Sequence, residues 1–321
     1  MSHLEVDHLE VYFKTPGGSK ELRAVDGVSL NIGNGESLGL VGESGCGKTT
    51  LGNAIMGLIP ITGGSIHFNG KEISGLQGRN MKPFRKQVQM IFQDPFGSLN
   101  PRMSVGACIL EVLQVHGLDE NGGKKKCHDR MLELLKMVGL DQEYASHYPH
   151  EFSGGQRQRI GIARALAVNP SLIIADEPVS ALDVSVQIQI LNLMKDIQKQ
   201  MNLSYLFIAH DLAVVRYICD RILVMYMGKI VESALADELF AHPAHPYTKA
   251  LLSAVPDVEK GLRARKQGSS RIVLKGDVPS AFEIISGCPF HPRCPYAEDI
   301  CKEQAPVKKS IGKDHFSVCH Y

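Results

Sequence analysis

The feature that most constrains this chain is a glycine-rich loop between a predicted strand and a predicted helix. Residues 42–49 read Gly-Glu-Ser-Gly-Cys-Gly-Lys-Thr, a complete G-x-x-x-x-G-K-[ST] pattern. The loop follows the apolar run 37–41 and leads into a helix-like segment at 50–56. Glycines let backbone N–H groups wrap around phosphates, and the positive end of a helix dipole favours an anion there. The loop therefore predicts a nucleotide site in which Lys48 reaches the β- and γ-phosphates and Thr49 ligates Mg²⁺.

Strand-like and helix-like segments alternate up to about residue 240, which predicts an α/β domain with a largely parallel sheet. The short apolar runs 172–175 and 205–209 read as further buried strands. Apolar residues at helical spacing predict a helix over 131–138, ended by Gly139, and another after Asp183. The lysine run 124–126 is expected in a solvated loop. Prolines and cysteines become frequent after about residue 240, so we expect a domain of residues 1–240 and a C-terminal extension of residues 241–321.

Charge and hydropathy exclude some partners. The 35 basic residues nearly balance the 34 acidic ones, so no basic stripe predicts nucleic-acid binding. No apolar run approaches the roughly 20 residues that cross a bilayer, which predicts a soluble, cytoplasmic chain.

A second anion-binding pattern lies at residues 153–156, which read Ser-Gly-Gly-Gln before a helix expected to reach about Val168. A serine hydroxyl, free backbone amides and a helix dipole together favour a phosphate. One chain does not need two γ-phosphate sites. The second pattern is therefore expected to cap ATP held by another subunit.

Both patterns, with several others in matching order, resemble the ATP-binding cassette (ABC) ATPases over nearly the whole chain. The resemblance implies a P-loop NTPase fold with a RecA-like core and a helical subdomain at about residues 96–162. It implies that Asp176 holds Mg²⁺ through water, that Glu177 is the general base and that His210 contacts the γ-phosphate. Gln93 would sense Mg²⁺ and the attacking water.

The resemblance also implies that Phe13 stacks on adenine, with the adjacent Tyr12 as the alternative, and that Asp183 belongs to a loop crossing the dimer interface. Catalysis is ascribed to Lys48, Gln93, Glu177 and His210, and Mg²⁺ binding to Thr49, Gln93 and Asp176. The residues expected around the nucleotide are Phe13, Gly42, Glu43, Ser44, Gly45, Cys46, Gly47, Lys48, Thr49, Thr50, Gln93, Ser153, Gly154, Gly155, Gln156, Asp176 and Asp183.

Residues 90–103, 178–187 and 245–252 resemble the F-type ATPases of dipeptide and oligopeptide importers. This resemblance implies a second ABC ATPase subunit, two transmembrane permeases, an extracytoplasmic peptide-binding protein and a peripheral position on the cytoplasmic face of the membrane. A D-type partner would give a heterodimer, and a homodimer stays open because both half-site motifs are intact. A nucleic-acid-associated cassette and a clamp without hydrolysis are the alternatives. The intact Glu177 and His210 argue against the clamp.

Four cysteines crowd into the C-terminal extension: Cys288, Cys294, Cys301 and Cys319, spaced C-x5-C-x6-C-x17-C. A disulfide framework is not expected in a reducing compartment, so the cluster indicates a metal site, with free structural thiols as the alternative. Four thiolates suit zinc or iron–sulfur, and the importer resemblance implies a [4Fe–4S] cluster that staples a tail with little core of its own. His242 and His245 each precede proline and are expected in turns rather than as ligands.

Overall fold

The computed structural model describes residues 3–14, 21–94, 96–118, 123–255 and 285–321, together with positions 272, 274, 276, 279, 282 and 283. Pro95, within the importer-like stretch 90–103, lies outside the described residues. The strands are β1 Leu4–Lys14, β2 Glu21–Ile32, β3 Ser37–Val41, β4 Gly63–Phe68, β5 Lys71–Glu72, β6 Val88–Ile91, β7 Leu172–Asp176, β8 Ser204–Ala209, β9 Arg221–Tyr226, β10 Lys229–Leu235, β11 Lys308–Gly312 and β12 His315–Val318. The α-helices are α1 Lys48–Ile55, α2 Lys82–Gln87, α3 Val105–Val115, α4 Gly123–Met137, α5 Gly154–Leu166, α6 Val184–Met201, α7 Leu212–Ile218, α8 Ala236–Ala241, α9 Pro246–Ser253 and α11 Asp299–Glu303.

The central sheet has eight strands in the order β11-β12-β10-β9-β3-β8-β7-β6. Strands β9, β3, β8, β7 and β6 are parallel neighbours, whereas β10, β12 and β11 extend the sheet by antiparallel pairing. Every residue of β3, β7 and β8 is buried, as expected for parallel strands covered on both faces. The strands at 37–41, 172–175 and 205–209 are confirmed. Their carboxyl ends share one edge of the sheet.

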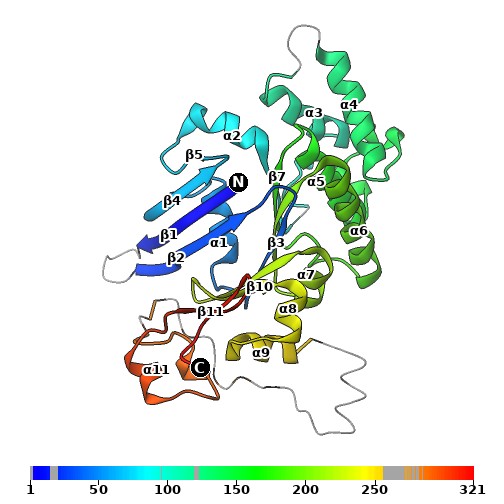
Figure 1. Ribbon diagram of the computed structural model, residues 1–321. Coiled ribbons are helices and arrows are strands. Elements are labelled where there is room, and N and C mark those ends of the chain that lie inside the picture. The colour runs from blue at the N-terminus through cyan, green and yellow to red at the C-terminus, as the bar shows by residue number, and fades with distance from the viewer. Residues whose placement is uncertain are drawn as a thin grey trace.

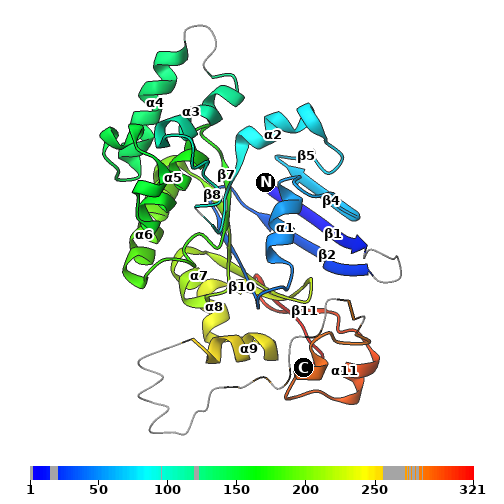
Figure 2. The same cartoon turned by 180° about the vertical axis from the view of Figure 1, so that it is seen from behind.

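A second, antiparallel sheet of order β2-β1-β4-β5 lies on one side of the central sheet, with α1 between them (Figures 1 and 2). Alternate residues of β8 divide the core because side chains alternate across a strand. Leu206 and Ile208 pack in one cluster with Leu51 of α1, whereas Tyr205 and Phe207 pack in the other with the helices of the opposite side. This layering holds the loop between β3 and α1 on a rigid support.

Helices α3, α4 and α5 form a lobe beside the sheet, where each contacts the others (Figure 1). The predicted stripe of α4 is confirmed: Met131, Leu134 and Leu135 are buried, and Gly139 with φ +73° follows the helix end. The loop expected at the lysine run 124–126 is wrong, because these residues form the exposed start of α4. The buried Cys127 anchors that turn to the core.

The C-terminal segment joins the central sheet directly. Strand β12 pairs with β10 through Glu232↔Ser317 and Ser233↔Phe316. The Glu232 carboxylate is fully buried and accepts hydrogen bonds from the backbone N–H groups of Ala244 and His245 and from the His315 ring at 2.9 Å. The tail therefore packs on the central sheet, whereas the sequence predicted a tail with little core of its own. Within the described residues, no helix is long and apolar enough to span a membrane.

Candidate nucleotide-binding and hydrolysis site

A pocket of about 830 Å³ opens at the carboxyl edge of β3, β7 and β8. Ten of the predicted residues line it: Phe13, Ser44, Gly45, Gly47, Lys48, Thr49, Thr50, Gln93, Glu177 and His210. The antiparallel sheet supplies one wall and the ends of the central strands supply the other. The phosphate loop, the predicted base and the predicted adenine platform therefore share one cavity.

The loop depends on glycine at Gly47, which precedes the first residue of α1 with φ +104°. A Cβ atom there would lie 1.9 Å from the backbone oxygen of Ala24 on β2. Gly45 also has a positive φ, of +81°, but its Cβ direction is open. Glycine is required at position 47 both for conformation and for space, because β2 presses against the loop.

Lys48 and Thr49 begin α1 and point to the two places where phosphate and metal are expected. The Lys48 side chain is buried and donates to the backbone oxygens of Gly42 and Glu43 at 2.9 and 3.0 Å. The Thr49 hydroxyl donates to Asp176 Oδ1 at 3.2 Å. Burial raises the pKa of Asp176, and the neighbouring Glu177 carboxylate raises it further, while Thr49 and Lys48 oppose the shift. A divalent cation would favour the ionised form of this carboxylate.

Glu177 follows the end of β7 in the left-handed region, with φ +45°. Its Oε2 atom accepts from the Gln93 amide at 3.1 Å and lies 3.0 Å from Nδ1 of His210. Its backbone is tied on both sides: its N–H donates to Ile208 and its carbonyl accepts from the Ser180 hydroxyl. A strained backbone at a non-glycine residue is typical of functional sites, where the surroundings fix one side-chain direction. Here that direction brings three predicted residues together.

The remaining loop residues face away from this pocket. Cys46 is buried beneath the loop, where burial raises the pKa of its thiol, so any contribution to nucleotide binding would come from its backbone. Gly42 is covered by Met225, whose backbone oxygen would lie 2.2 Å from a Cβ atom. Phe13 lines the pocket and Tyr12 does not, because the Tyr12 hydroxyl donates to Asp26 at 2.7 Å. Phe13 is therefore the better placed of the two to stack on adenine.

Sequence reasoning missed five residues of the pocket wall: Leu22, Ala24, Asp94, Ser180 and Ala181. Asp94 directly follows Gln93, and Ser180 lies in the stretch after Glu177, so their neighbours could have indicated them. Leu22 and Ala24 come from β2, which carries no motif; only the sheet packing brings them to the loop.

The second anion pattern lies apart from this pocket. Ser153 caps α5: its hydroxyl accepts from the N–H of Gln156 at 3.4 Å, and the Gln156 side chain accepts from the N–H of Ser153 at 2.9 Å. Ser153 and Gly154 are exposed, and none of residues 153–156 lines the pocket. Asp183, exposed at the start of α6, does not line it either. The structure of one chain thus leaves these motifs facing outward, available to another molecule.

The four tail cysteines line one small cavity together with His245, His291 and His320. Burial, and then the other three thiols, raise the pKa of Cys288 to about 11. His245 caps α9, where its Nδ1 accepts from the N–H of Tyr247, and burial lowers its pKa to about 4, so the ring is neutral. Throughout the described part of the chain, no three His, Cys, Asp or Glu side chains are arranged to hold a single metal ion.

Comparisons with known proteins agree with this geometry. Residues 25–180 match the family model described as ABC transporter, and residues 231–301 match the model described as oligopeptide/dipeptide transporter, C-terminal region. The oligopeptide transport ATP-binding protein AppF of Bacillus subtilis is 50% identical, over 99% of this chain and 96% of AppF. Among solved structures, the dimeric cassette MJ0796 with ADP and Pi is 29% identical with a TM-score of 0.65, covering 73% of this chain and 98% of MJ0796. The protein cbiO1 of Clostridium perfringens, part of the ABC transporter complex cbiONQ, is 26% identical with a TM-score of 0.64, covering 75% of this chain and 91% of cbiO1.

Proposed function

This chain belongs to the ABC transporter family, and on that premise we propose that it is the ATPase subunit of an importer of oligopeptides or dipeptides. ABC ATPases of this kind hydrolyse ATP, and the chain is such an enzyme. The observation that carries the proposal is the Glu177–Gln93–His210 group beside the phosphate loop, within a chain whose C-terminal region matches the peptide-transporter model.

Each residue has a separate task in the proposed mechanism. Lys48 leaves its backbone acceptors and contacts the β- and γ-phosphates, while the α1 N-terminus supplies backbone amides. Thr49 and Asp176 would hold Mg²⁺, with Gln93 at its edge; the bound ion offsets charge that develops on the phosphoryl group. Glu177 accepts the proton of the attacking water, and His210 orients the γ-phosphate. Phe13 supplies a ring for adenine.

We propose that residues 153–155 close over ATP bound to a second ABC ATPase subunit, and that Asp183 lies at that interface. Their exposed position supports an interface role, and the solved cassette MJ0796 is dimeric. A heterodimer with a D-type subunit is the favoured arrangement, and a homodimer is the alternative. Residues 1–240 would form the ATPase domain, with a helical subdomain at about 96–162 facing two permeases on the cytoplasmic face of the membrane, and residues 241–321 the extension.

Reconstitution tests the cargo. The chain is reconstituted in vesicles with its permeases and paired ATPase, and the peptide-binding protein and labelled oligopeptide are placed in the lumen. The complex is expected to move the oligopeptide out of the lumen only when MgATP is present outside. The same complex carrying Glu177→Gln is the control and should bind peptide without net transport. ATP hydrolysis by the assembled complex that no peptide stimulates, with no peptide moved, would contradict the importer assignment while leaving the ATPase intact.

We further propose that Cys288, Cys294, Cys301 and Cys319 ligate a [4Fe–4S] cluster. The supporting observation is their convergence on one cavity with no Asp or Glu side chain in its lining. Four thiolates suit zinc as well as an iron–sulfur cluster, and the resemblance to peptide importers is what favours the cluster. Its positive iron would lower the raised pKa of Cys288 on binding.

Protein isolated without oxygen is expected to contain iron and acid-labile sulfide in equal amounts and to absorb visible light. Cys301→Ser, in which a buried ligand is exchanged, should lose most of both. Cys127→Ser is the matched control, because Cys127 is equally buried but lies on α4. Stoichiometric zinc in place of iron would contradict the cluster assignment.

A further inference from the structure

Glu43 of the phosphate loop contacts Arg293, which lies in the cysteine-bearing tail of residues 285–321. Arg293 holds the Glu43 carboxylate in a fork: its two terminal nitrogens donate to Oε2 at 2.6 Å and to Oε1 at 3.0 Å. The Arg293 side chain is 7% exposed and that of Glu43 26% exposed. A buried, bidentate arginine–carboxylate pair fixes geometry as well as charge, unlike an exposed ion pair.

The backbone of Glu43 is held as firmly as its side chain. Its N–H donates to the Tyr247 hydroxyl at 2.8 Å, and its carbonyl accepts from Lys48 at 3.0 Å. Tyr247 is fully buried on α9. Thus Arg293 and Tyr247, both from the C-terminal part of the chain, position Glu43. The Glu43 carbonyl is the acceptor that Lys48 would leave when it binds phosphate.

Arg293 owes its own position to the cysteine segment. It lies between Cys288 and Cys294 and ends the short 3₁₀ turn His291–Arg293. Phe290, in the same segment, inserts its ring against Tyr226 and Tyr247, with centroids 5.2 and 5.4 Å apart. Cys294 directly follows Arg293, so a displacement of the Cys294 side chain would also displace Arg293.

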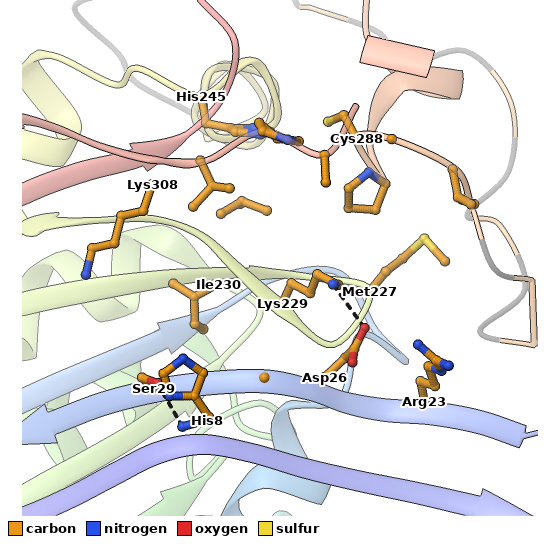
Figure 3. A pocket seen from close by; sticks show the side chains of 18 of the residues that line it. His8, Arg23, Asp26, Ser29, Met227, Lys229, Ile230, His245, Cys288 and Lys308 are labelled. Atoms are coloured by element: carbon orange, nitrogen blue, oxygen red, sulfur yellow. Dashed lines mark hydrogen bonds and ion pairs between the residues drawn. The ribbon is translucent and has the colours of Figure 1, made fainter. Parts of the chain in front are cut away.

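The tail leaves much of β2 uncovered on this side. A pocket of about 680 Å³ separates Cys288 from Asp26 and Arg23 of β2 (Figure 3). Asp26 pairs instead with Lys229 of β10, at 3.0 Å. Neither Arg293 nor Glu43 lines this pocket; the fork lies beside the packed rings of Tyr226 and Tyr247.

We propose that Arg293 is a positioning residue for the phosphate loop, which holds Glu43 and so links nucleotide affinity to the fold of the cysteine-bearing tail. The inference rests on the proposed nucleotide site and is independent of the cargo. A loop held before binding loses less conformational entropy when it closes on phosphate. By linkage, bound nucleotide must stabilise the tail by the same factor.

Binding of MgADP to the full chain, measured by calorimetry, tests the first half. Arg293→Ala and Glu43→Gln are each expected to weaken binding roughly 5- to 20-fold, and Arg293→Lys less, because lysine keeps the charge but not the fork. The double variant should bind MgADP no more weakly than the weaker-binding single variant, because both substitutions remove the same interaction. In the assembled ATPase, the KM for ATP should rise while kcat stays within about twofold, because Glu177 is untouched.

Lys302→Ala is the matched control, because Lys302 lies in the same tail and pairs with Asp299 at 2.8 Å in an exposed ion pair away from the loop. It should bind MgADP like the unaltered chain. Glu43→Gln changes only the loop side, so it tests the pair even where an Arg293 variant unfolds. Unaltered affinity in a folded Glu43→Gln protein, or additive losses in the double variant, would overturn the inference. Failure of the unaltered chain to bind MgADP would instead overturn the nucleotide site.

Hydrogen exchange tests the reciprocal half. MgADP is expected to slow amide exchange across residues 286–301 severalfold in the unaltered chain and in Lys302→Ala, and to leave it unchanged in Glu43→Gln. A purely structural role for Arg293 would leave the nucleotide response of this segment equal in all three proteins. That equality would contradict the proposed link.

Discussion

Replacing Glu177 with glutamine is expected to lower ATP turnover roughly 1,000-fold, the range lost with a general base. Glutamine fills the same space and can keep a hydrogen bond to Gln93 or His210, but it cannot accept the water proton. The strained φ of +45° and the bonds to Ile208 and Ser180 do not depend on the carboxylate charge, so the fold should persist. Phosphate release from the assembled ATPase at saturating MgATP measures the effect.

Nucleotide binding separates loss of chemistry from loss of the site. The Glu177→Gln protein should bind MgATP within about threefold of the unaltered chain, because Lys48 and Thr49 are unchanged. Glu133→Gln is the matched control: Glu133 pairs with Arg130 at 2.8 Å on α4, outside the pocket, and its substitution should leave turnover unchanged. Normal turnover by Glu177→Gln would assign the proton transfer to another group.

Two alanine substitutions within the phosphate loop are expected to differ widely in stability. Both Gly47 and Gly45 have positive φ, which costs an alanine about 1–2 kcal/mol. At Gly47 the new Cβ would also lie 1.9 Å from the Ala24 oxygen and 3.0 Å from the Met225 side chain, whereas at Gly45 nothing lies within 4 Å. Gly47→Ala should therefore lower the free energy of unfolding by a further several kcal/mol, because β2 or the loop must move.

Urea denaturation of the full chain without nucleotide measures both variants, with Gly45→Ala as the control for conformational cost alone. Gly47→Ala should also weaken MgADP binding at least tenfold, since the displaced loop no longer points its amides at phosphate. Equal urea midpoints for the two variants would contradict the prediction, because they would show that the loop shifts away from β2 at no cost in stability.

The loop, the parallel strands and the helices were predictable because each has a local signature. Gly42 to Thr49 form a pattern in eight residues, and 37–41 is an unbroken apolar run before it. The contacts that required the structure join residues far apart in the chain. Arg293 and Glu43 are 250 residues apart, and Ala24 meets Gly47 only because β2 folds against the loop. Arg293 and Ala24 lie in no sequence motif, so nothing in the sequence indicates that they contact Glu43 and Gly47.

The lysine run at 124–126 shows the opposite limit. Charge and adjacent glycines favoured a loop there, yet helix α4 begins at Gly123 because Cys127, Met131 and Leu134 bury one face. Tertiary packing overrode a local preference. Ser153, by contrast, is exposed, as a residue expected to reach ATP on another subunit must be.

The place of β12 in the central sheet also dictates an order of biosynthetic events. Strand β10 is complete at Leu235, but its partner β12 begins only at His315. At ordinary elongation rates this interval lasts on the order of ten seconds. During this interval the free edge of β10 is unpaired, and the Glu232 carboxylate lacks its partner His315. A nascent chain arrested there would expose this edge to chaperones or to strand exchange with a second copy of the chain.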